Sequence, residues 1–429
     1  MTSFTDGRRR RRREDEEEPR NGNATLPVPS EGARLTYADL ARWTPQAPVK
    51  ETFHPVIHRG VSSPTGMTVL RPPSSDPRDA MPPIYLMRET KATQAYALIA
   101  KAPISLSHHD TGWGCVLFAV IYKRVGNSNT FQAPEKPEYV AIKQLDKAVV
   151  AKHMANGGEE DPFKEIQRMQ ELGDNYHVLK CTEALENDKY LYIVTPKACD
   201  EGGTLKDIIP WMQEGVEPSR AHSLFVQILE ILDYLMKHDI CHHDLSPDNF
   251  VFLSKDNLVA FDLALSLRMP RNEQGSHRTL MTPQGNFGTR AWQAPEVFCD
   301  QADDGSRRAF DGAGYDLWSA AVLLYNLLTG QVLYEIPHFA NISYRYFILA
   351  GGLGSRPINE RTVEILMDTF GDTEEVQRRQ HKLLTQAMAH LNLTPEAVVL
   401  LENLLEVDPS ARWNLAQAME SDYVTTHKN

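Results

Sequence analysis

The sequence predicts an α+β protein in which a small strand-rich part precedes a larger helical part. Three observations support this prediction. Between residues 94 and 196, short runs of apolar and β-type residues are separated by polar turns, as strands are. From Ser219 onward, apolar residues recur with the period of an α-helix. The chain has 429 residues, which is enough for a large core shared by two such parts.

Residues 1–93 are expected to form a disordered, low-complexity extension, because prolines and small polar residues recur there. Arg8–Arg13 form a basic run, and five acidic residues follow it directly. Such a run can serve nuclear import or nucleic-acid binding. The simpler interpretation is a solvated tail that its acidic neighbours neutralise.

The strand-rich part is expected to begin near Gln94. Its strands are predicted at residues 95–106, 115–125, 139–145 and 188–196. A long polar hairpin insertion is expected at 126–138, where glycine, asparagine and proline cluster.

One helix is predicted within this part, at residues 161–173. Asp161 is a suitable N-cap and Pro162 fits the first turn. Apolar side chains recur along one face, at Phe163, Ile166, Met169 and Leu172. Longer apolar periodicities predict the later helices, at 220–240, 315–330 and 395–408.

The composition excludes several function classes. With 41% hydrophobic and 24% charged residues, the chain is ordinary for a globular protein. The net charge of −12 makes broad binding to nucleic acids or anionic membranes unexpected. No apolar run suggests a signal peptide or a transmembrane helix. The five cysteines have no CxxC spacing, which fits a reducing intracellular location, cytoplasmic or nuclear.

A lysine and a glutamate are the first candidates for chemistry. Lys143 ends the run "VAIK" in a predicted strand, and Glu165 lies on the predicted helix that follows. A lysine that neutralises phosphates needs an anionic partner to fix its position, and Glu165 could face back toward it. Taken alone, Lys143 is equally well a surface lysine whose stem covers a strand edge.

Three further residues could act on a phosphate and a cation. In "HHDLSPDN", Asp244 could accept the proton of an attacking hydroxyl, and Asn249 could offer a neutral oxygen to Mg²⁺. Asp262 ends a strand in "VAFDLALS" and could bind the same cation. Each alone is by default a loop residue, but the order of all five is far more specific. A zinc site at Cys241–Asp244 is discounted, because adjacent residues cannot wrap a tetrahedral ion.

This order resembles the signature of the eukaryotic protein kinase family over about residues 95–425. The resemblance implies a two-lobed fold, with a small β-rich N-lobe at about 94–196 and a larger α-helical C-lobe at about 200–425, in a domain at 94–425. Lys143 would bind phosphates, Asp244 would be the catalytic base, and Asn249 and Asp262 would hold Mg²⁺. ATP and Mg²⁺ are the implied cofactors.

The resemblance assigns further roles. The adenine and its surroundings would be contacted by Val116, Ala141, Thr195 and Val251, and the phosphate loop would contain Gly112 and Gly114. In "GTRAWQAPEV", Thr289 implies Ser/Thr targets in proteins rather than Tyr. Structural anchors are implied as well: Asp316 would hold the catalytic-loop backbone, and Glu296 would pair with Arg412.

The sequence departs from the family pattern in four places. His109 and Thr111 replace the first two glycines of the phosphate loop, and Asp110 adds negative charge, so ATP binding should weaken. His243 replaces the arginine that normally holds an activation-loop phosphate, so phosphorylation at Thr279 or Thr282 should matter less.

The third and fourth departures lie close to the reacting groups. Ser246 replaces a lysine that steadies the γ-phosphate, which removes a contact worth about 2–4 kcal/mol. Leu263 and Ala264 replace the Phe and Gly of DFG, so a flip of this segment should be restricted.

Two functions therefore remain from the sequence. The first is an ATP-dependent Ser/Thr protein kinase, since Lys143, Glu165, Asp244, Asn249 and Asp262 are all present. The second is a pseudokinase that acts as a scaffold or allosteric partner, with the helix-rich stretch 362–393 as a candidate docking surface. A regulatory partner is compatible with both. A nucleic-acid binder that uses Arg8–Arg13 is the weakest hypothesis.

Overall fold

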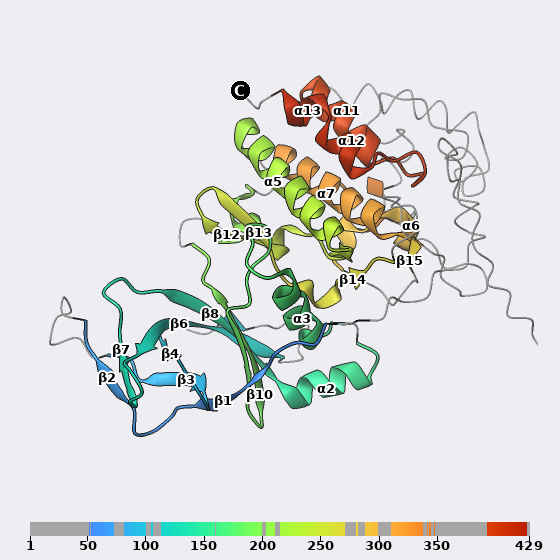
Figure 1. Cartoon of the computed structure of the whole chain (residues 1–429). Coiled ribbons are helices and arrows are strands. Elements are labelled where there is room, and N and C mark those ends of the chain that lie inside the picture. Colours follow the sequence, from blue (N-terminus) through green and yellow to red (C-terminus); the bar gives the residue numbers. More distant parts are fainter. Residues whose placement is uncertain are drawn as a thin grey trace, which may run out of the picture.

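The computed structural model describes most of the chain between residues 51 and 426. The described ranges are 51, 53–72, 81–99, 104–105, 113–158, 160–199, 203–210, 215–270, 280–281, 288–298, 310–337, 341, 343–344, 347 and 393–426. The strands of the N-terminal half and the long helices of the C-terminal half form two neighbouring regions (Figure 1).

The strand-rich region is one sheet of ten strands. These are β1 (His58–Ser62), β2 (Thr68–Leu70), β3 (Ile84–Arg88), β4 (Gln94–Leu98), β5 (Ile104–Ser105), β6 (Gly114–Arg124), β7 (Thr130–Gln132), β8 (Tyr139–Asp146), β9 (Glu183–Glu186) and β10 (Tyr190–Pro196). The pairing runs β6-β4-β3-β1-β9-β10-β8 and returns to β6, because β6 also pairs with β8. The sheet therefore closes on itself, which protects the edges of these strands from pairing with other chains.

The prediction of disorder for residues 1–93 is wrong for 53–72 and 81–93. β1 pairs antiparallel with β3 and parallel with β9, so this part of the extension completes the closed sheet. The strands are short and lie between prolines, and β1 finds one of its partners far along the chain. The composition of this segment is for these reasons like that of a disordered tail, which is why the sequence predicts disorder there. Residues 1–50 lie outside the described ranges.

The other predicted strands are confirmed with small changes. The stretch 95–106 contains two strands, β4 and β5, which both pair with β6. The polar insertion 126–138 is not wholly a loop, because β7 lies within it and pairs with β6 and with β2. Lys143 lies within β8, opposite Val116 of β6 and Ile193 of β10.

Gly114 allows β6 and β8 to approach each other closely. A Cβ atom at this position would lie 1.8 Å from the carbonyl oxygen of Gln144. Replacement by alanine must therefore push the two strands apart. We expect Gly114→Ala to lower the free energy of unfolding by about 1–3 kcal/mol, measured by chemical denaturation. Cys115→Ala, at the next residue, should cost clearly less, and equal stability of Gly114→Ala and the wild type would contradict this role.

Helices are confirmed at four predicted places, 161–173, 220–240, 315–330 and 395–408. The stretch 362–393, also expected to be rich in helix, lies outside the described residues except for its last residue. The described helices are α2 (Lys147–Ala155), α3 (Pro162–Leu172), α4 (Leu205–Ile208), α5 (Pro218–Lys237), α6 (Pro295–Phe298), α7 (Gly312–Thr329), α11 (Pro395–Leu404), α12 (Leu415–Met419) and α13 (Asp422–Thr425). Asp161 caps α3 as predicted, and its carboxylate accepts hydrogen bonds from the N–H groups of Phe163 and Lys164. Phe163 itself is 37% exposed, so it does not belong to the buried stripe. α2 was not predicted.

One buried apolar cluster joins the two regions. It contains Leu145 of β8, Ile166 of α3 and Ile193 of β10, together with the inner faces of α5 and α7. Short elements between the regions carry the polar residues of interest: β11 (Ile240–Cys241), the 3₁₀ turns Pro247–Asn249 and Leu263–Leu265, and the hairpin of β12 (Phe250–Ser254) and β13 (Asn257–Ala260). None of the described helices combines the length and the apolar character that crossing a bilayer requires.

Candidate active site

The structure brings Lys143, Glu165 and Asp262 together. The Lys143 ammonium lies 2.8 Å from a carboxylate oxygen of Glu165, on α3. It also lies 3.8 Å from a carboxylate oxygen of Asp262, which follows β13. The interpretation of Glu165 as the partner of Lys143 agrees with this geometry. A charge-assisted hydrogen bond of this length fixes the position of the lysine.

The two partners respond differently to burial. Burial alone would lower the pKa of Lys143, but the charges of Asp262 and Glu165 outweigh it and raise the pKa, so the lysine stays protonated. Burial raises the pKa of Glu165 to about 7, although Lys143 opposes the shift. Burial disfavours the ionised form of Glu165, and the nearby ammonium of Lys143 favours it. The pair therefore depends on the position of α3, which places Glu165 beside the ammonium.

Asp244 is held by hydrogen bonds from two directions. One carboxylate oxygen accepts from the N–H and the hydroxyl of Thr289, at 2.7 and 3.0 Å. The other accepts from the side-chain amide of Asn249 at 2.9 Å. Gly288 has φ +64°, and a Cβ there would lie 2.8 Å from the carbonyl oxygen of His243, so the close approach of Thr289 requires glycine. Burial raises the pKa of the Asp244 carboxyl, which favours proton acceptance.

The backbone just before Asp244 is anchored by a side chain of α7. The buried carboxylate of Asp316 accepts hydrogen bonds from the N–H groups of His242 and His243, at 2.7 and 3.0 Å. The resemblance implies this role for Asp316, and the geometry agrees with it. The anchor fixes the two residues that precede Asp244.

Asn249 and Asp262 have the donor atoms that Mg²⁺ prefers. The amide nitrogen of Asn249 is used in bonds to Asp244, which leaves its amide oxygen as the atom for a cation. Asp262 has a left-handed backbone, φ 60° and ψ 67°, and Leu263 after it is fully buried. One carboxylate and one amide oxygen fit a Mg²⁺ ion that keeps waters and binds phosphate oxygens. Among the described residues, no three His, Cys, Asp or Glu side chains form a metal cluster.

The residues proposed to contact adenine lie on four strands, β6, β8, β10 and β12. Val116 of β6 is directly opposite Lys143, and Ala141 of β8 is opposite Thr195 of β10. The Thr195 hydroxyl donates to the Ala141 carbonyl at 3.5 Å, and Val251 of β12 is buried. The phosphate-loop residue Gly112, like the substituted positions 109–111, lies outside the described residues.

His243 occupies an apolar position rather than a phosphate site. Its ring is fully buried, stacks on Phe310 with a centroid distance of 5.1 Å and an angle of 11°, and lies 4.7 Å from the ring of Tyr315. Burial lowers the pKa of His243 to about 3, and the charge of Lys164 acts in the same direction. The ring is therefore neutral near pH 7, which supports the expectation that it does not bind an activation-loop phosphate.

This burial predicts a pH effect on stability. The unfolded chain takes up a proton at His243 below its ordinary pKa of 6.5, whereas the folded chain does so only near 3. Stability from the neutral ring is thus present above pH 6.5 and is lost as the pH falls, by about 1.4 kcal/mol per pH unit. His243→Phe should keep the ring stack and remove this slope. Parallel curves of unfolding free energy against pH for the two proteins would contradict the prediction.

Ser246 carries no charge at the position where the family has a lysine. The residue is 1% exposed, and its hydroxyl has no hydrogen-bond partner among the described residues. Two residues later, Asp248 binds Lys206 of α4 at 2.8 Å. Ser246 therefore cannot supply the positive charge with which that lysine steadies the γ-phosphate.

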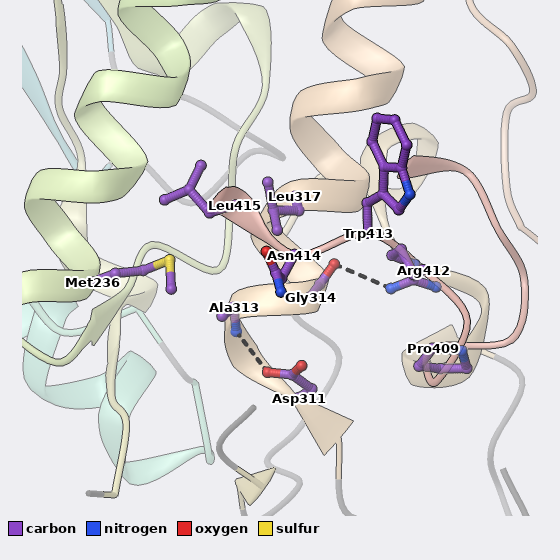
Figure 2. Close-up of a pocket in the computed structure, with 10 residues that line it drawn as sticks. All are labelled: Met236, Asp311, Ala313, Gly314, Leu317, Pro409, Arg412, Trp413, Asn414 and Leu415. Atoms are coloured by element: carbon purple, nitrogen blue, oxygen red, sulfur yellow. Dashed lines mark hydrogen bonds between the residues drawn. The ribbon is translucent and has the colours of Figure 1, made fainter. Parts of the chain in front are cut away.

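Glu296 and Arg412 form the buried pair that the resemblance implies. The guanidinium donates to both carboxylate oxygens of Glu296, at 2.7 and 3.0 Å, and to the carbonyl of Gly314 at 3.0 Å. Figure 2 shows this bond to Gly314 beside a small pocket between α5, the start of α7 and the segment before α12. The pocket lies in the helical region, apart from Lys143 and Asp244.

One charged cluster beside the site was missed. Arg168 on α3 is 1% exposed and binds Glu51, from the extension. Arg268, just beyond the Asp262 segment, also binds Glu51. The only signal in the sequence was a charged residue at the spacing i+3 from Glu165, which is equally typical of a solvated helix face.

Comparisons with known proteins agree with this geometry. A family model described as a protein kinase domain matches residues 125–424, more than two thirds of the chain. CBL-interacting serine/threonine-protein kinase 7 of Arabidopsis thaliana is 28% identical over 252 residues, 55% of this chain and 54% of that protein. CBL-interacting serine/threonine-protein kinase 26 of the same plant is 33% identical, over 47% of this chain and 42% of that protein.

A yeast protein gives a similar match. Serine/threonine-protein kinase CHK1 of Saccharomyces cerevisiae is 28% identical over 44% of this chain and 34% of that protein. The chain thus spans about half the length, or less, of the curated relatives it matches.

Proposed function

Since the chain belongs to the protein kinase family, we propose that it is a working serine/threonine kinase that transfers the γ-phosphoryl group of Mg-ATP to protein hydroxyls. The nucleotide would bind between a β-rich N-lobe and a helical C-lobe. The observation that supports this most strongly is the Lys143–Glu165 pair at 2.8 Å with Asp262 beside it. Asp244, which would receive the proton, is held ready by Thr289.

The residues would divide the reaction between them. The hydroxyl oxygen of the substrate attacks the γ-phosphorus, the bond from the β–γ bridging oxygen to that phosphorus breaks, and the hydroxyl proton passes to Asp244. Lys143 would offset the charge on the phosphates, and Asn249 and Asp262 would hold Mg²⁺. When bound, Mg²⁺ supplies positive charge to the phosphate oxygens. Positioning and electrostatics carry most of such catalysis, and the fixed contacts of Lys143 and Asp244 suit that task.

The choice of Ser/Thr substrates is supported by Thr289 and by the names of the relatives. Two relatives are named as CBL-interacting, which concerns those proteins. For this chain we propose that its substrates are proteins. We also propose that it has a regulatory protein partner. An intracellular location is part of the proposal too, since free cysteines such as Cys115, Cys181, Cys199 and Cys241 suit a reducing compartment.

The alternative is a pseudokinase that acts as a scaffold or allosteric partner. Ser246 favours it, because this residue carries no charge at the position where the family has the lysine that steadies the γ-phosphate. The substitutions at 109–111 favour it as well, since they should weaken nucleotide binding. This alternative predicts weak or metal-independent nucleotide binding and no transfer.

The test is transfer from γ-labelled Mg-ATP to a mixture of Ser-, Thr- and Tyr-containing peptides. We expect label on Ser and Thr, and a decrease of about 10²-fold or more in Lys143→Met. Lys147→Met is the matched control, because Lys147 pairs with Glu186 on the same sheet and lies outside the proposed site. No transfer above that of Lys143→Met would favour the pseudokinase, and label on Tyr would contradict the assignment of Ser/Thr substrates.

A further inference from the structure

The segment that leads into β1 runs along α3, the helix that carries Glu165. We name Glu51 and residues 53–57 the strap. In Figure 1 the blue chain before β1 starts beside α3. The N–H of Val56 donates to the side chain of Gln170 at 2.7 Å, and the amide of Gln170 donates back to the Val56 carbonyl at 2.8 Å. The strap is therefore hydrogen-bonded to α3, on the side of the helix that does not face the apolar core.

Glu51 is the centre of a compact charge cluster. Its carboxylate accepts from both terminal nitrogens of Arg168, one of them at 2.9 Å, and from Nε of Arg268 at 3.2 Å. Glu171 of α3 also accepts from Arg168, at 3.2 Å, and from Arg268, at 2.6 Å. The cluster holds two positive and two negative groups, so its charges balance. Burial alone would raise the pKa of Glu51, but the two guanidinium groups lower it, so it stays ionised.

The cluster connects the strap to two segments of the proposed site, the helix α3 and the segment that follows Asp262. Arg168 and Glu171 lie on α3, and Arg168 is three residues beyond Glu165. Arg268 lies in β14 (Leu267–Arg268), which closely follows Asp262. α3 and the turn after Asp262 also meet directly, because the N–H of Asp161 donates to the carbonyl of Ala264 at 3.4 Å. Glu51 thus links α3, which carries Glu165, to the segment that follows Asp262.

We propose that Glu51 is a positioning residue, and that the strap acts as a built-in activating segment which holds α3 where Glu165 reaches Lys143. This rests on the proposed kinase function. The core side of α3 is apolar, and apolar packing tolerates small shifts and rotations of a helix better than directional bonds do. Arg168 has only 1% of its surface exposed. Without Glu51, its guanidinium keeps Glu171 but loses its bidentate partner, so α3 must move to give it water or another partner.

The test compares full-length wild type with Glu51→Gln, which keeps the shape of the side chain and removes its charge. Arg59→Gln is the matched control, because Arg59 of β1 makes an exposed ion pair with Asp188 away from α3. Two quantities are measured: amide hydrogen exchange in residues 162–172, and labelled transfer from Mg-ATP. We expect faster exchange in α3 but not in α5 or α7, and transfer lowered by about 10- to 100-fold. Arg59→Gln should match the wild type in both.

A second variant keeps the test decisive if Glu51→Gln folds poorly. Gln170→Ala removes both bonds to Val56 and puts a better helix former in α3. Faster exchange in α3 of this variant cannot then come from a loss of helix propensity. In a Glu165→Gln background, Glu51→Gln should cause little further loss of transfer, whereas a merely structural role would lower it again.

The outcomes separate this inference from the proposed function. Unchanged α3 exchange in both Glu51→Gln and Gln170→Ala would overturn the role of the strap, whatever the activity. If the wild type transfers no phosphate, the proposed function fails, and the exchange of α3 alone decides whether the strap holds the helix.

Discussion

Asp262→Ala should abolish phosphoryl transfer, with a decrease of about 10³-fold or more. The change removes the only carboxylate that we assign to Mg²⁺, and it also removes a negative charge 3.8 Å from the Lys143 ammonium. The loss should appear in labelled transfer from Mg-ATP and in the Mg²⁺ dependence of nucleotide binding. Thermal unfolding should change little by comparison, because the Asp262 side chain is 38% exposed.

An exposed aspartate nearby provides the control. Asp256, in the turn between β12 and β13, pairs with Arg220 at 3.2 Å, and its side chain is 79% exposed. Asp256→Ala should retain transfer. Mg²⁺-dependent transfer that is undiminished in Asp262→Ala would contradict the assigned metal ligand and, with it, the assigned site.

Arg412→Met should lower the free energy of unfolding by about 3–5 kcal/mol. Arg412 is 2% exposed, lies 4.8 Å from the ring of Trp318, and donates to Glu296. It also donates to the carbonyl of Gly314, as Figure 2 shows. Its removal leaves the Glu296 carboxylate buried without its counter-charge. Chemical denaturation of the two proteins measures the difference.

A second change separates loss of the pair from loss of packing. Glu296→Gln combined with Arg412→Met removes the buried charge, so the double variant should be more stable than Arg412→Met alone. Lys123→Met provides a surface comparison, since Lys123 and Glu138 form an exposed pair, and it should cost about 0–1 kcal/mol. A cost as small as this for Arg412→Met would show that the buried pair does not stabilise the fold.

The sequence predicts the parts of the fold whose signals are local. Asp161 caps α3 because its side chain reaches the N–H groups of the next residues, so a short stretch contains the whole signal. The long helices α5 and α7 follow from their apolar period. The extension could not be predicted in the same way, because β1 is stabilised by pairing with β3 and with the distant β9. Its own composition gives no hint of either partner.

The site divides along the same line. Lys143, Asp244 and Asp262 could be identified because family motifs have a fixed order along the chain. Glu51 could not, because its role depends on Arg168 and Arg268, which only the fold brings to it. A histidine in place of arginine at position 243 is already a reason to doubt that this residue binds a phosphate. The structure supplies the physical account, a neutral ring stacked on Phe310.

The central claim is that "CHHDLSPDNF" is a working catalytic loop despite its substitutions. The most direct measurement is transfer of label from γ-labelled Mg-ATP to Ser/Thr peptides and to the chain itself, with Asp244→Asn beside the wild type. Unfolding curves of both proteins establish that they are folded. Transfer by the wild type that falls about 10³-fold or more in Asp244→Asn is the result we predict. Equal transfer by the two folded proteins, or none by either, would contradict the claim.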